Sequence, residues 1–434
     1  MNGPGDAVPN APGDAVPSAA DVVVVGGGLV GATVAYELAG AGVGVALVDA
    51  ALPGRASDAG AGIVSPETFH DADEQWYRFG ARAAEYLRAL PSRLADDGIA
   101  LGVDAFASCG SLVVALAEHE DPWFEEVLQL AVARSPAVSE VTSDEARALF
   151  PPLARVWRAL HSPAACRVDG RRLRDAVRAG AARRGATLVD MHVTGLDTRA
   201  GRVSAVHGDR ATISCGALVL AGGAWSAEAG RWLGTALPVS PTKGQIVHVV
   251  LPGGDGAGSG ADRADGAGRG TGADAAGDDG SDTGRWPIVQ PVANFYLVPW
   301  PGGRVACGGT FEADAGFDVR PTAGGLRDLL RECVAIAPGL ADATFHEVRV
   351  GLRPTSADDR PLLGPLSGTE NVHLCTGHGA NGLLMGPWSG ALVASGITAG
   401  TGITAGTGIT AGTGITAGTP DPMPYAATRL PTWS

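Results

Sequence analysis

The chain lacks the features that would suit it to bind nucleic acid or to depend on disulfide bonds. Its 434 residues carry 32 basic against 46 acidic side chains, and no run of basic residues is present to neutralise phosphates. Its six cysteines lie far apart without a CxxC pair, which is typical of reduced thiols rather than of a disulfide framework or a metal site. We therefore expect no nucleic-acid partner and no bound metal.

Signals for export or membrane insertion are also lacking. The first twenty residues have neither a basic start nor an apolar stretch, so they do not resemble a signal peptide. The apolar region 22–48 has the length of a membrane span, but Glu37 and seven glycines interrupt it. These observations predict a cytoplasmic protein without a transmembrane segment, and the 45% of hydrophobic residues is enough for a large core.

Three segments have a composition that does not favour packed structure. Residues 1–19 repeat a Pro-Gly-Asp-Ala-Val-Pro motif, residues 252–285 consist almost entirely of Gly, Ala, Asp, Ser and Thr, and residues 398–434 hold most of a fourfold Gly-Ile-Thr-Ala-Gly-Thr repeat. Such segments bury too little apolar surface to fold alone. We expect a disordered N-terminal tail, a disordered insertion and a low-complexity C-terminal tail.

The clearest local motif follows a run of four valines near the N-terminus. Gly26, Gly28 and Gly31 fit G-x-G-x-x-G, and Asp49 ends the next apolar segment. In dinucleotide-binding folds these glycines allow a tight turn, close approach of a pyrophosphate to the backbone and close packing of helix on strand. The helix N-terminus adds unpaired N–H groups, and Asp49 would accept hydrogen bonds from ribose hydroxyls. The motif predicts a dinucleotide-binding strand–helix–strand unit.

The order of the expected elements indicates two kinds of sheet. Strand–helix–strand patterns occur near both ends of the chain, whereas the middle is richer in strands joined by short turns. The expected elements include helices over 74–90, 169–184 and 322–336, and separate strands over 187–196, 211–214 and 217–221. This order predicts an α/β fold in which a parallel sheet is interrupted by a second domain.

The glycine motif alone does not distinguish FAD from NAD, because both cofactors carry an ADP moiety. Asp49 disfavours the 2′-phosphate of NADP. Further glycine-rich turns at 60–62, 222–223 and 377–382 favour an extended cofactor that contacts several turns. An NAD-dependent dehydrogenase is the alternative at this point.

Separated blocks of sequence form a longer pattern. They are GGGLVGA with Asp49, SDAGAGIVSP at 57–66, AGGAWS at 221–226, KGQ at 243–245, YLVP at 296–299, GLRPTSADDRPLLGP at 351–365 and TGHGANGLLMGP at 376–387. In this order and spacing, the region 21–395 without the insertion resembles the FAD-dependent amine and amino-acid oxidoreductases, a family that includes glycine oxidase, sarcosine oxidase and D-amino acid dehydrogenases.

The resemblance implies a discontinuous domain organisation. A Rossmann-type FAD-binding domain with a parallel sheet would comprise residues 20–90, 160–232 and 345–397. An α+β substrate domain with a mainly antiparallel sheet would comprise residues 91–159 and 233–344.

The resemblance also implies which residues hold FAD. The expected cofactor-binding residues are Gly26, Gly28, Leu29, Val30, Gly31, Asp49, Ser57, Ala61, Gly62, Ile63, Val193, Gly222, His378, Gly379, Ala380, Asn381, Gly382, Leu383 and Leu384. The last seven form a turn at a helix N-terminus, whose N–H groups would stabilise the negative charge of reduced flavin. Family members with covalent flavin carry a cysteine near 351–354, and this sequence has none there. We therefore expect non-covalent FAD.

Three residues match the substrate pocket of the family. Arg353 would bind an α-carboxylate through its guanidinium group, Tyr296 would hydrogen-bond the carboxylate or close the site, and Phe311 would form an apolar wall over the flavin. The alternatives are an ion pair of Arg353 with Asp358 or Asp359, and ordinary core packing of the two aromatic rings.

Three other positions qualify this assignment. Ala380 stands where glycine oxidase-like members carry a second arginine, which weakens a specific assignment to glycine. His378 is expected to contact the flavin as a turn residue rather than to act as a base, because hydride transfer needs alignment and a neutral amine. Lys243 would either influence oxygen reactivity near the flavin or stabilise a strand edge.

These residues predict FAD-dependent oxidation of a small amino acid, with a D-amino acid favoured. Hydride transfer from Cα to flavin N5 would give an imine, which water would hydrolyse to a 2-oxo acid and ammonia. The alternatives are a secondary amine substrate such as sarcosine or a proline derivative, and a non-catalytic FAD-binding subunit of a larger complex. No motif selects oxygen, a quinone or a carrier protein as the electron acceptor, and none indicates an oligomeric state.

Overall fold

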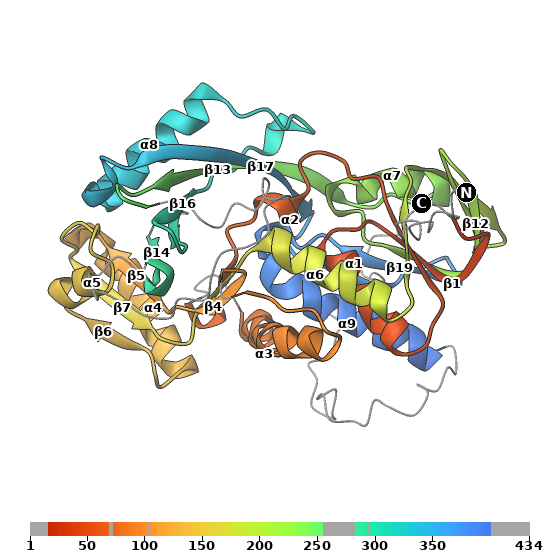
Figure 1. The fold of residues 1–434 in the computed structure, drawn as a ribbon, viewed down its shortest axis with the longest axis horizontal. Coiled ribbons are helices and arrows are strands. Elements are labelled where there is room, and N and C mark those ends of the chain that lie inside the picture. The colour runs from red at the N-terminus through yellow and green to blue at the C-terminus, as the bar shows by residue number, and fades with distance from the viewer. Residues whose placement is uncertain (1–15, 69–72, 103, 255–282, 293–294, 401–434) are drawn as a thin grey trace, which may run out of the picture.

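The computed structural model describes residues 16–68, 73–102, 104–254, 283–292 and 295–400, which form three β-sheets with helices packed around them (Figure 1). The predicted tails and insertion lie largely outside the described residues, at 1–15, 255–282 and 401–434. Residues 398–400, which were expected to begin the C-terminal tail, continue the last helix instead.

The first sheet has a parallel core that starts at the N-terminus. Its strands follow the order β10-β11-β12-β1-β2-β9, and β19 joins through β12 and also pairs with β18. The parallel strands are β1 (Ala19–Val25), β2 (Val45–Asp49), β9 (Thr187–Asp190), β12 (Thr212–Leu220) and β19 (Val372–Thr376). The antiparallel additions are β10 (Val193–Arg199), β11 (Arg202–Gly208) and β18 (Leu362–Pro365).

Both faces of this sheet are covered, which explains the continuous run of valines in β1. Val22 and Val24 pack into a core with α1, α3, α6 and α9, whereas Val23 packs into the opposite core with α7. These helices are α1 (Leu29–Gly40), α3 (Glu74–Asp96), α6 (Gly170–Arg183), α7 (Ser226–Leu233) and α9 (Gly382–Gly400).

The second sheet is almost entirely antiparallel, with the order β17-β13-β16-β15-β14-β5-β7-β6. Its strands are β5 (Ser111–Ala115), β6 (Ser139–Val141), β7 (Arg158–Ser162), β13 (Val239–Val250), β14 (Ile288–Pro291), β15 (Tyr296–Pro299), β16 (Arg304–Gly308) and β17 (Thr344–Ser356). Only the β5–β14 pair among them is parallel. Its outer face packs against α8 (Ala323–Ile336) and α5 (Ser143–Leu149).

Smaller elements connect the two large sheets. A third sheet contains β3 (Ile63–Val64), β8 (Cys166–Val168) and β4 (Phe106–Ser108). The remaining α-helices are α2 (Ala56–Ala59) and α4 (Asp121–Arg134), and short 3-10 helices cover Pro66–Thr68, Glu118–Glu120, Gly223–Trp225, Thr283–Arg285, Ala313–Ala315, Pro338–Leu340 and Gly379–Asn381.

The predicted fold class is confirmed, but four predicted elements have other boundaries. The helix expected to stop at residue 90 continues through Pro91 to Asp96, because Leu94 extends its buried face. The strand expected over 187–196 is two strands, β9 and β10. The segments 211–214 and 217–221 form one continuous strand, β12, because β1 pairs with it from Ser214 to Leu220 and so joins the two segments.

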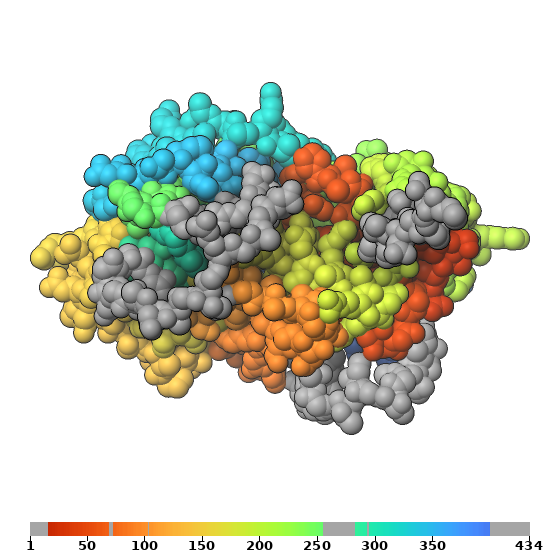
Figure 2. All heavy atoms as spheres, viewed as in Figure 1, coloured from red at the N-terminus to blue at the C-terminus, as the bar shows by residue number. Residues whose placement is uncertain are grey.

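The two large sheets occupy opposite ends of the molecule. In Figure 2, residues of β5–β7 and of α8 form the left and upper-left surface, whereas residues near the N-terminus and around β11 form the right. Within the described ranges, no helix is both long and apolar enough to cross a membrane.

Candidate active site

One cavity brings together nearly all of the predicted site residues. It is lined by the β1–α1 turn, α2, the segment before β3, the start of α9 and the inner face of the second sheet. Of the predicted residues, Gly31 alone does not line it. The other predicted residues on its wall are Gly26, Gly28, Leu29, Val30, Asp49, Ser57, Ala61, Gly62, Ile63, Val193, Gly222, Tyr296, Phe311, Arg353, His378, Gly379, Ala380, Asn381, Gly382, Leu383 and Leu384.

The β1–α1 turn requires glycine for reasons visible in its packing. Gly26 has φ +110°, and a Cβ there would lie 2.3 Å from the Ala221 carbonyl oxygen. A Cβ on Gly31 would lie 1.9 Å from the Gly26 carbonyl oxygen, so Gly31 allows the helix to pack onto the turn from behind the cavity. The Leu29 N–H at the start of α1 donates to Ser57 Oγ at 3.0 Å. The turn thus presents backbone and a helix N-terminus to the cavity.

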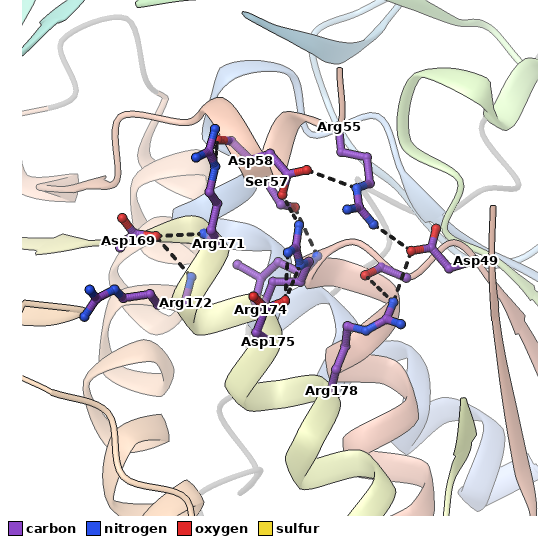
Figure 3. A network of polar contacts seen from close by, with 12 residues as sticks. Asp49, Arg55, Ser57, Asp58, Asp169, Arg171, Arg172, Arg174, Asp175 and Arg178 are labelled. Carbon is purple, nitrogen blue, oxygen red and sulfur yellow. Dashed lines mark hydrogen bonds and ion pairs between the residues drawn. The ribbon is translucent and has the colours of Figure 1, made fainter. Parts of the chain in front are cut away.

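Asp49, at the end of β2, is held by two arginines that the sequence did not single out. Its Oδ2 accepts from Arg55 Nη1 at 2.7 Å and from Arg178 Nη1 at 3.1 Å, and Arg178 also lies 3.3 Å from the Gly27 carbonyl oxygen (Figure 3). Both arginines use the same carboxylate oxygen. Among the described residues no hydrogen bond reaches Oδ1, which therefore keeps its capacity to accept.

Arg171, Arg174 and Arg178 of α6 form a row that contacts Asp58 of α2 and Asp49 (Figure 3). Asp169 caps this helix by accepting from the Arg171 and Arg172 N–H groups at 3.0 and 3.1 Å. One turn further on, Arg174 pairs with Asp58 of α2, and Arg178 follows one turn later. Spacing of three to four residues places these side chains on one helix face, and that periodicity in the sequence could have identified them.

A second glycine turn joins α2 to the third sheet. Gly62 has φ +79°, and a Cβ there would lie 1.8 Å from the Val168 carbonyl oxygen. A Cβ on Gly60 would lie 2.5 Å from Leu383 Cδ1 at the start of α9. The turn at Gly60–Gly62 therefore packs against the start of α9, and the segments around Gly26, Gly62 and Gly382 all line the cavity.

His378 lies in the turn before α9 and is 3% exposed. Its Nε2 is buried and finds no hydrogen-bond partner within the described part of the chain. Burial lowers the pKa of His378 to about 4, so the imidazole is neutral at physiological pH. The side chain consequently offers a neutral hydrogen-bonding atom beside the cavity rather than a cation.

Arg353 projects from β17 and keeps its charge available. Its Nη1 donates to the Thr310 carbonyl oxygen at 2.9 Å, and the Phe311 ring lies 4.1 Å from its guanidinium carbon. Within the described ranges it forms no ion pair, so the alternative pairing with Asp358 or Asp359 is wrong. Burial lowers the pKa of Arg353 and the neighbouring Tyr296 raises it, but an arginine remains protonated at any physiological pH.

Tyr296 and Phe311 differ in their surroundings. Burial raises the pKa of Tyr296 to about 12, so its hydroxyl is protonated and can donate a hydrogen bond. A Cβ on Gly308 would lie 2.6 Å from this hydroxyl oxygen, so the glycine makes room for the ring. Phe311 is 54% exposed, which contradicts the alternative of ordinary core packing. It covers the guanidinium group of Arg353 instead.

A buried network supports the loop that carries Thr310 and Phe311. Lys243, 1% exposed, lies 3.3 Å from Glu312 Oε2, and Gln245 Nε2 and Thr310 Oγ1 each donate to Glu312 Oε1 at 2.6 Å. Burial raises the pKa of Glu312, but the hydrogen bonds from Gln245, Thr310 and Lys243 outweigh it and lower the pKa overall. Lys243 does not line the cavity, which favours the structural alternative for this residue.

Known proteins resemble this chain over most of its length. Residues 21–395 match the family model described as DAO, FAD dependent oxidoreductase. The chain is 33% identical over 376 residues to the oxidoreductase YurR of Bacillus subtilis and 32% identical over 379 residues to a glycine oxidase of Pseudomonas aeruginosa. Each alignment covers 86% of this chain and 93% of the relative.

Two solved structures share the fold over almost their whole length. Iminodiacetate oxidase from Chelativorans sp. BNC1 has a TM-score of 0.77 and 34% identity, covering 87% of this chain and 95% of the other. Glycine oxidase from Geobacillus kaustophilus has a TM-score of 0.77 and 25% identity, covering 95% of this chain and 99% of the other.

Proposed function

The chain belongs to the family of FAD-dependent oxidoreductases, and from this we propose that it oxidises the amine of a small amino acid. A D-amino acid is the first substrate class to test. The product would be an imine, which water hydrolyses to a 2-oxo acid and, from a primary amine, to ammonia. The observation that carries the proposal is the position of Arg353, without a carboxylate partner in the described structure, on the cavity that also contains the glycine turn of a dinucleotide site.

The residues on the cavity wall fit non-covalently bound FAD. The glycine turns leave space where a Cβ would clash with neighbouring backbone, and the start of α1 offers N–H groups to a pyrophosphate. The buried Nε2 of His378 and the turn at Gly379–Asn381 would meet the flavin end. When bound, FAD supplies the two-electron acceptor for hydride transfer.

Arg353 and Tyr296 would hold the substrate for this transfer. A guanidinium group binds a carboxylate with two parallel hydrogen bonds. These bonds increase the affinity for the substrate and also hold its Cα in a defined position. The protonated Tyr296 hydroxyl would donate a further hydrogen bond to the same carboxylate. Phe311 is exposed and lies over the guanidinium group of Arg353. Its ring would move aside to admit the carboxylate, or would stay over the guanidinium group and exclude water.

Neither titratable group beside the substrate acts as a base near neutral pH. Tyr296, with a pKa of about 12, stays protonated, and His378, with a pKa of about 4, stays neutral and is a weak base. The amine must therefore lose its proton before hydride transfer. We expect kcat/KM to rise with pH through the pKa of the substrate amine.

A secondary amine is the second candidate substrate. It is supported by the 34% identity to a protein whose name describes it as an iminodiacetate oxidase. Sarcosine, proline derivatives and iminodiacetate would enter with the carboxylate on Arg353 in the same way.

Anaerobic reduction of the purified holoenzyme tests the proposal. Loss of visible flavin absorption with a D-amino acid, an L-amino acid, glycine or a secondary amine identifies the substrate class. Reoxidation by air, by a quinone analogue or only by a carrier protein then identifies the acceptor. If no amine in the panel reduces the flavin, the proposal is wrong and the non-catalytic subunit takes its place.

A further inference from the structure

One polar group in the cavity has no role in binding the dinucleotide or the substrate carboxylate as proposed above. Gln290 lies on β14 and lines the cavity. Its Nε2 is buried, and no acceptor is found for it among the described residues. A buried amide N–H without an acceptor is unfavourable, and such groups are rare in folded proteins. This side chain therefore points to a ligand group that can accept a hydrogen bond.

The strand register places Gln290 beside the expected substrate. Val289 pairs with Leu297 in the antiparallel β14–β15 ladder, so the next pair in this register joins Gln290 and Tyr296. Val289 and Leu297 both point into the outer core, and Gln290 and Tyr296 therefore share the opposite, cavity-facing side. Gln290 therefore lies on the strand next to that of Tyr296, and the backbones of neighbouring strands are about 4.8 Å apart.

The surroundings of this carboxamide are apolar. Gln290 is paired with Val113 of β5 on its other side, and Val292 and Phe295 line the same cavity. A neutral donor in apolar surroundings suits an uncharged acceptor, because a carboxylate would lose its hydration and gain only one neutral hydrogen bond here.

We propose that Gln290 is a specificity-determining residue that donates a hydrogen bond to an uncharged carbonyl oxygen on the substrate arm that extends from Tyr296 toward β5. The inference rests on the proposed function, because Arg353 and Tyr296 must first hold the carboxylate. The site would therefore prefer an amino acid with an amide-bearing arm to one with an alkyl arm or with a second carboxylate.

Binding of ligands that cannot be oxidised tests this preference. In (carbamoylmethylthio)acetate a thioether replaces the amine, (isobutylthio)acetate has the same shape without the carbonyl, and thiodiacetate carries a second carboxylate. Their Kd values are measured on the FAD-loaded enzyme through the change in flavin absorption. We expect the amide ligand to bind most tightly.

Substitution of Gln290 should remove the preference. In Gln290→Leu we expect affinity for the amide ligand to fall about five- to tenfold and affinity for the isobutyl ligand to change less than about twofold. Gln129→Leu is the matched control, because Gln129 lies on the exposed face of α4 and its one side-chain bond within the described residues is to Glu125. Gln290→Met serves as a second variant if the leucine variant retains less FAD than wild type.

The outcomes separate the two proposals. An equal loss for the amide and isobutyl ligands, or no loss for either, overturns the role of Gln290 while leaving the proposed function intact. If none of the three carboxylates binds and Arg353→Met changes nothing, the carboxylate subsite itself is wrong and both proposals fail.

The same variants decide where the arm is attached. N-(carbamoylmethyl)glycine carries the amide on nitrogen, and D-asparagine carries it on Cα. We expect Gln290→Leu to lower kcat/KM for one of the two by about five- to tenfold. Unchanged kcat/KM for both would overturn the inference.

Discussion

The two ends of the cavity are built in different ways. At the dinucleotide end the wall is backbone, and the glycines at 26, 31 and 62 are required because a Cβ would meet a carbonyl oxygen. At the substrate end the wall is side chain, and a Cβ on Gly244 would instead lie 2.2 Å from Nη1 of Arg353. Backbone contacts cannot relax without moving a strand or a helix, whereas a guanidinium group can shift.

We expect this difference to separate cofactor retention from substrate recognition. Changes at the backbone-lined end should release FAD or unfold the protein. Changes at the side-chain-lined end should leave FAD in place and alter the binding of the carboxylate. The predictions below are arranged by the size of the expected effect.

The largest effect, loss of all activity together with bound FAD, is expected from Gly31→Ala. The added Cβ would lie 1.9 Å from the Gly26 carbonyl oxygen, so α1 must move away from the turn. We expect destabilisation of about 1–3 kcal/mol and loss of bound FAD, measured by thermal unfolding and by flavin absorption per protein. Normal FAD content in this variant would show that the turn does not depend on this close contact. Gly42→Ala is a control for a glycine with open space around it, although its φ of +82° carries its own strain.

The next largest effect is expected from Arg353→Met. Removing a charged partner of the substrate carboxylate typically costs about 2–5 kcal/mol, which corresponds to a fall in kcat/KM of roughly 30-fold or more. FAD content should stay at the wild-type level. A variant with wild-type kinetics would remove Arg353 from the substrate site.

Gly244→Ala should have an effect of intermediate size. It distinguishes most clearly between substrate binding at one end of the cavity and FAD binding at the other. The three atoms nearest to the new methyl group all belong to the guanidinium group of Arg353, which the methyl group would displace. We expect KM to rise about tenfold, with less change in kcat and with FAD retained. Loss of FAD from this variant would contradict the separation of the two ends.

Arg178→Met should weaken FAD binding without abolishing it. Arg178 bonds to Asp49 at 3.1 Å, and Arg55 holds the same carboxylate oxygen when Arg178 is removed. We expect the Kd for FAD, titrated into apoprotein, to rise by up to about tenfold. Arg183→Met is the control on the same helix, because Arg183 bonds to the Asp97 and Gly98 carbonyl oxygens instead. Equal effects of both variants would indicate a general role of α6.

The smallest effect concerns acid stability. Because the folded pKa of Glu312 is lowered, its ionised form contributes stability that is fully present above the ordinary glutamate pKa of about 4.3 and is lost as pH falls below it. Glu312→Gln should therefore flatten the dependence of the unfolding temperature on pH below this value. The difference should stay under about 1 kcal/mol because the side chain is partly exposed. If the unfolding temperature of Glu312→Gln depends on acid pH as it does in the wild type, Lys243 and Gln245 do not stabilise the ionised form of Glu312.

The same contrast explains what the sequence could predict. The α/β fold and the turn at Gly26–Gly31 were accessible because backbone-built features leave contiguous glycine and valine patterns. The third sheet and the exact strand breaks could not be predicted, because they depend on which strands become neighbours. The helix predicted over 74–90 continues through Pro91 to Asp96, because tertiary burial of Leu94 outweighs the local effect of the proline.

The substrate end could be predicted only through its resemblance to a family. Arg353 and Tyr296 lie 57 positions apart in the sequence numbering, and no local pattern joins them. Gln290, Arg55 and Arg178 were missed because their roles arise from strand register and helix packing. The row of arginines in α6 was visible in the sequence, but its partners Asp49 and Asp58 lie more than a hundred residues away.

The central claim is that one cavity holds both the flavin and a carboxylate on Arg353. Titration of the wild-type holoenzyme and of Arg353→Met with (isobutylthio)acetate, followed by flavin absorption, tests it most directly. We expect a saturable change in the wild-type spectrum and none over the same concentrations in the variant, although both proteins contain FAD. A ligand that binds both proteins equally, or that binds without altering the flavin spectrum, would contradict the claim.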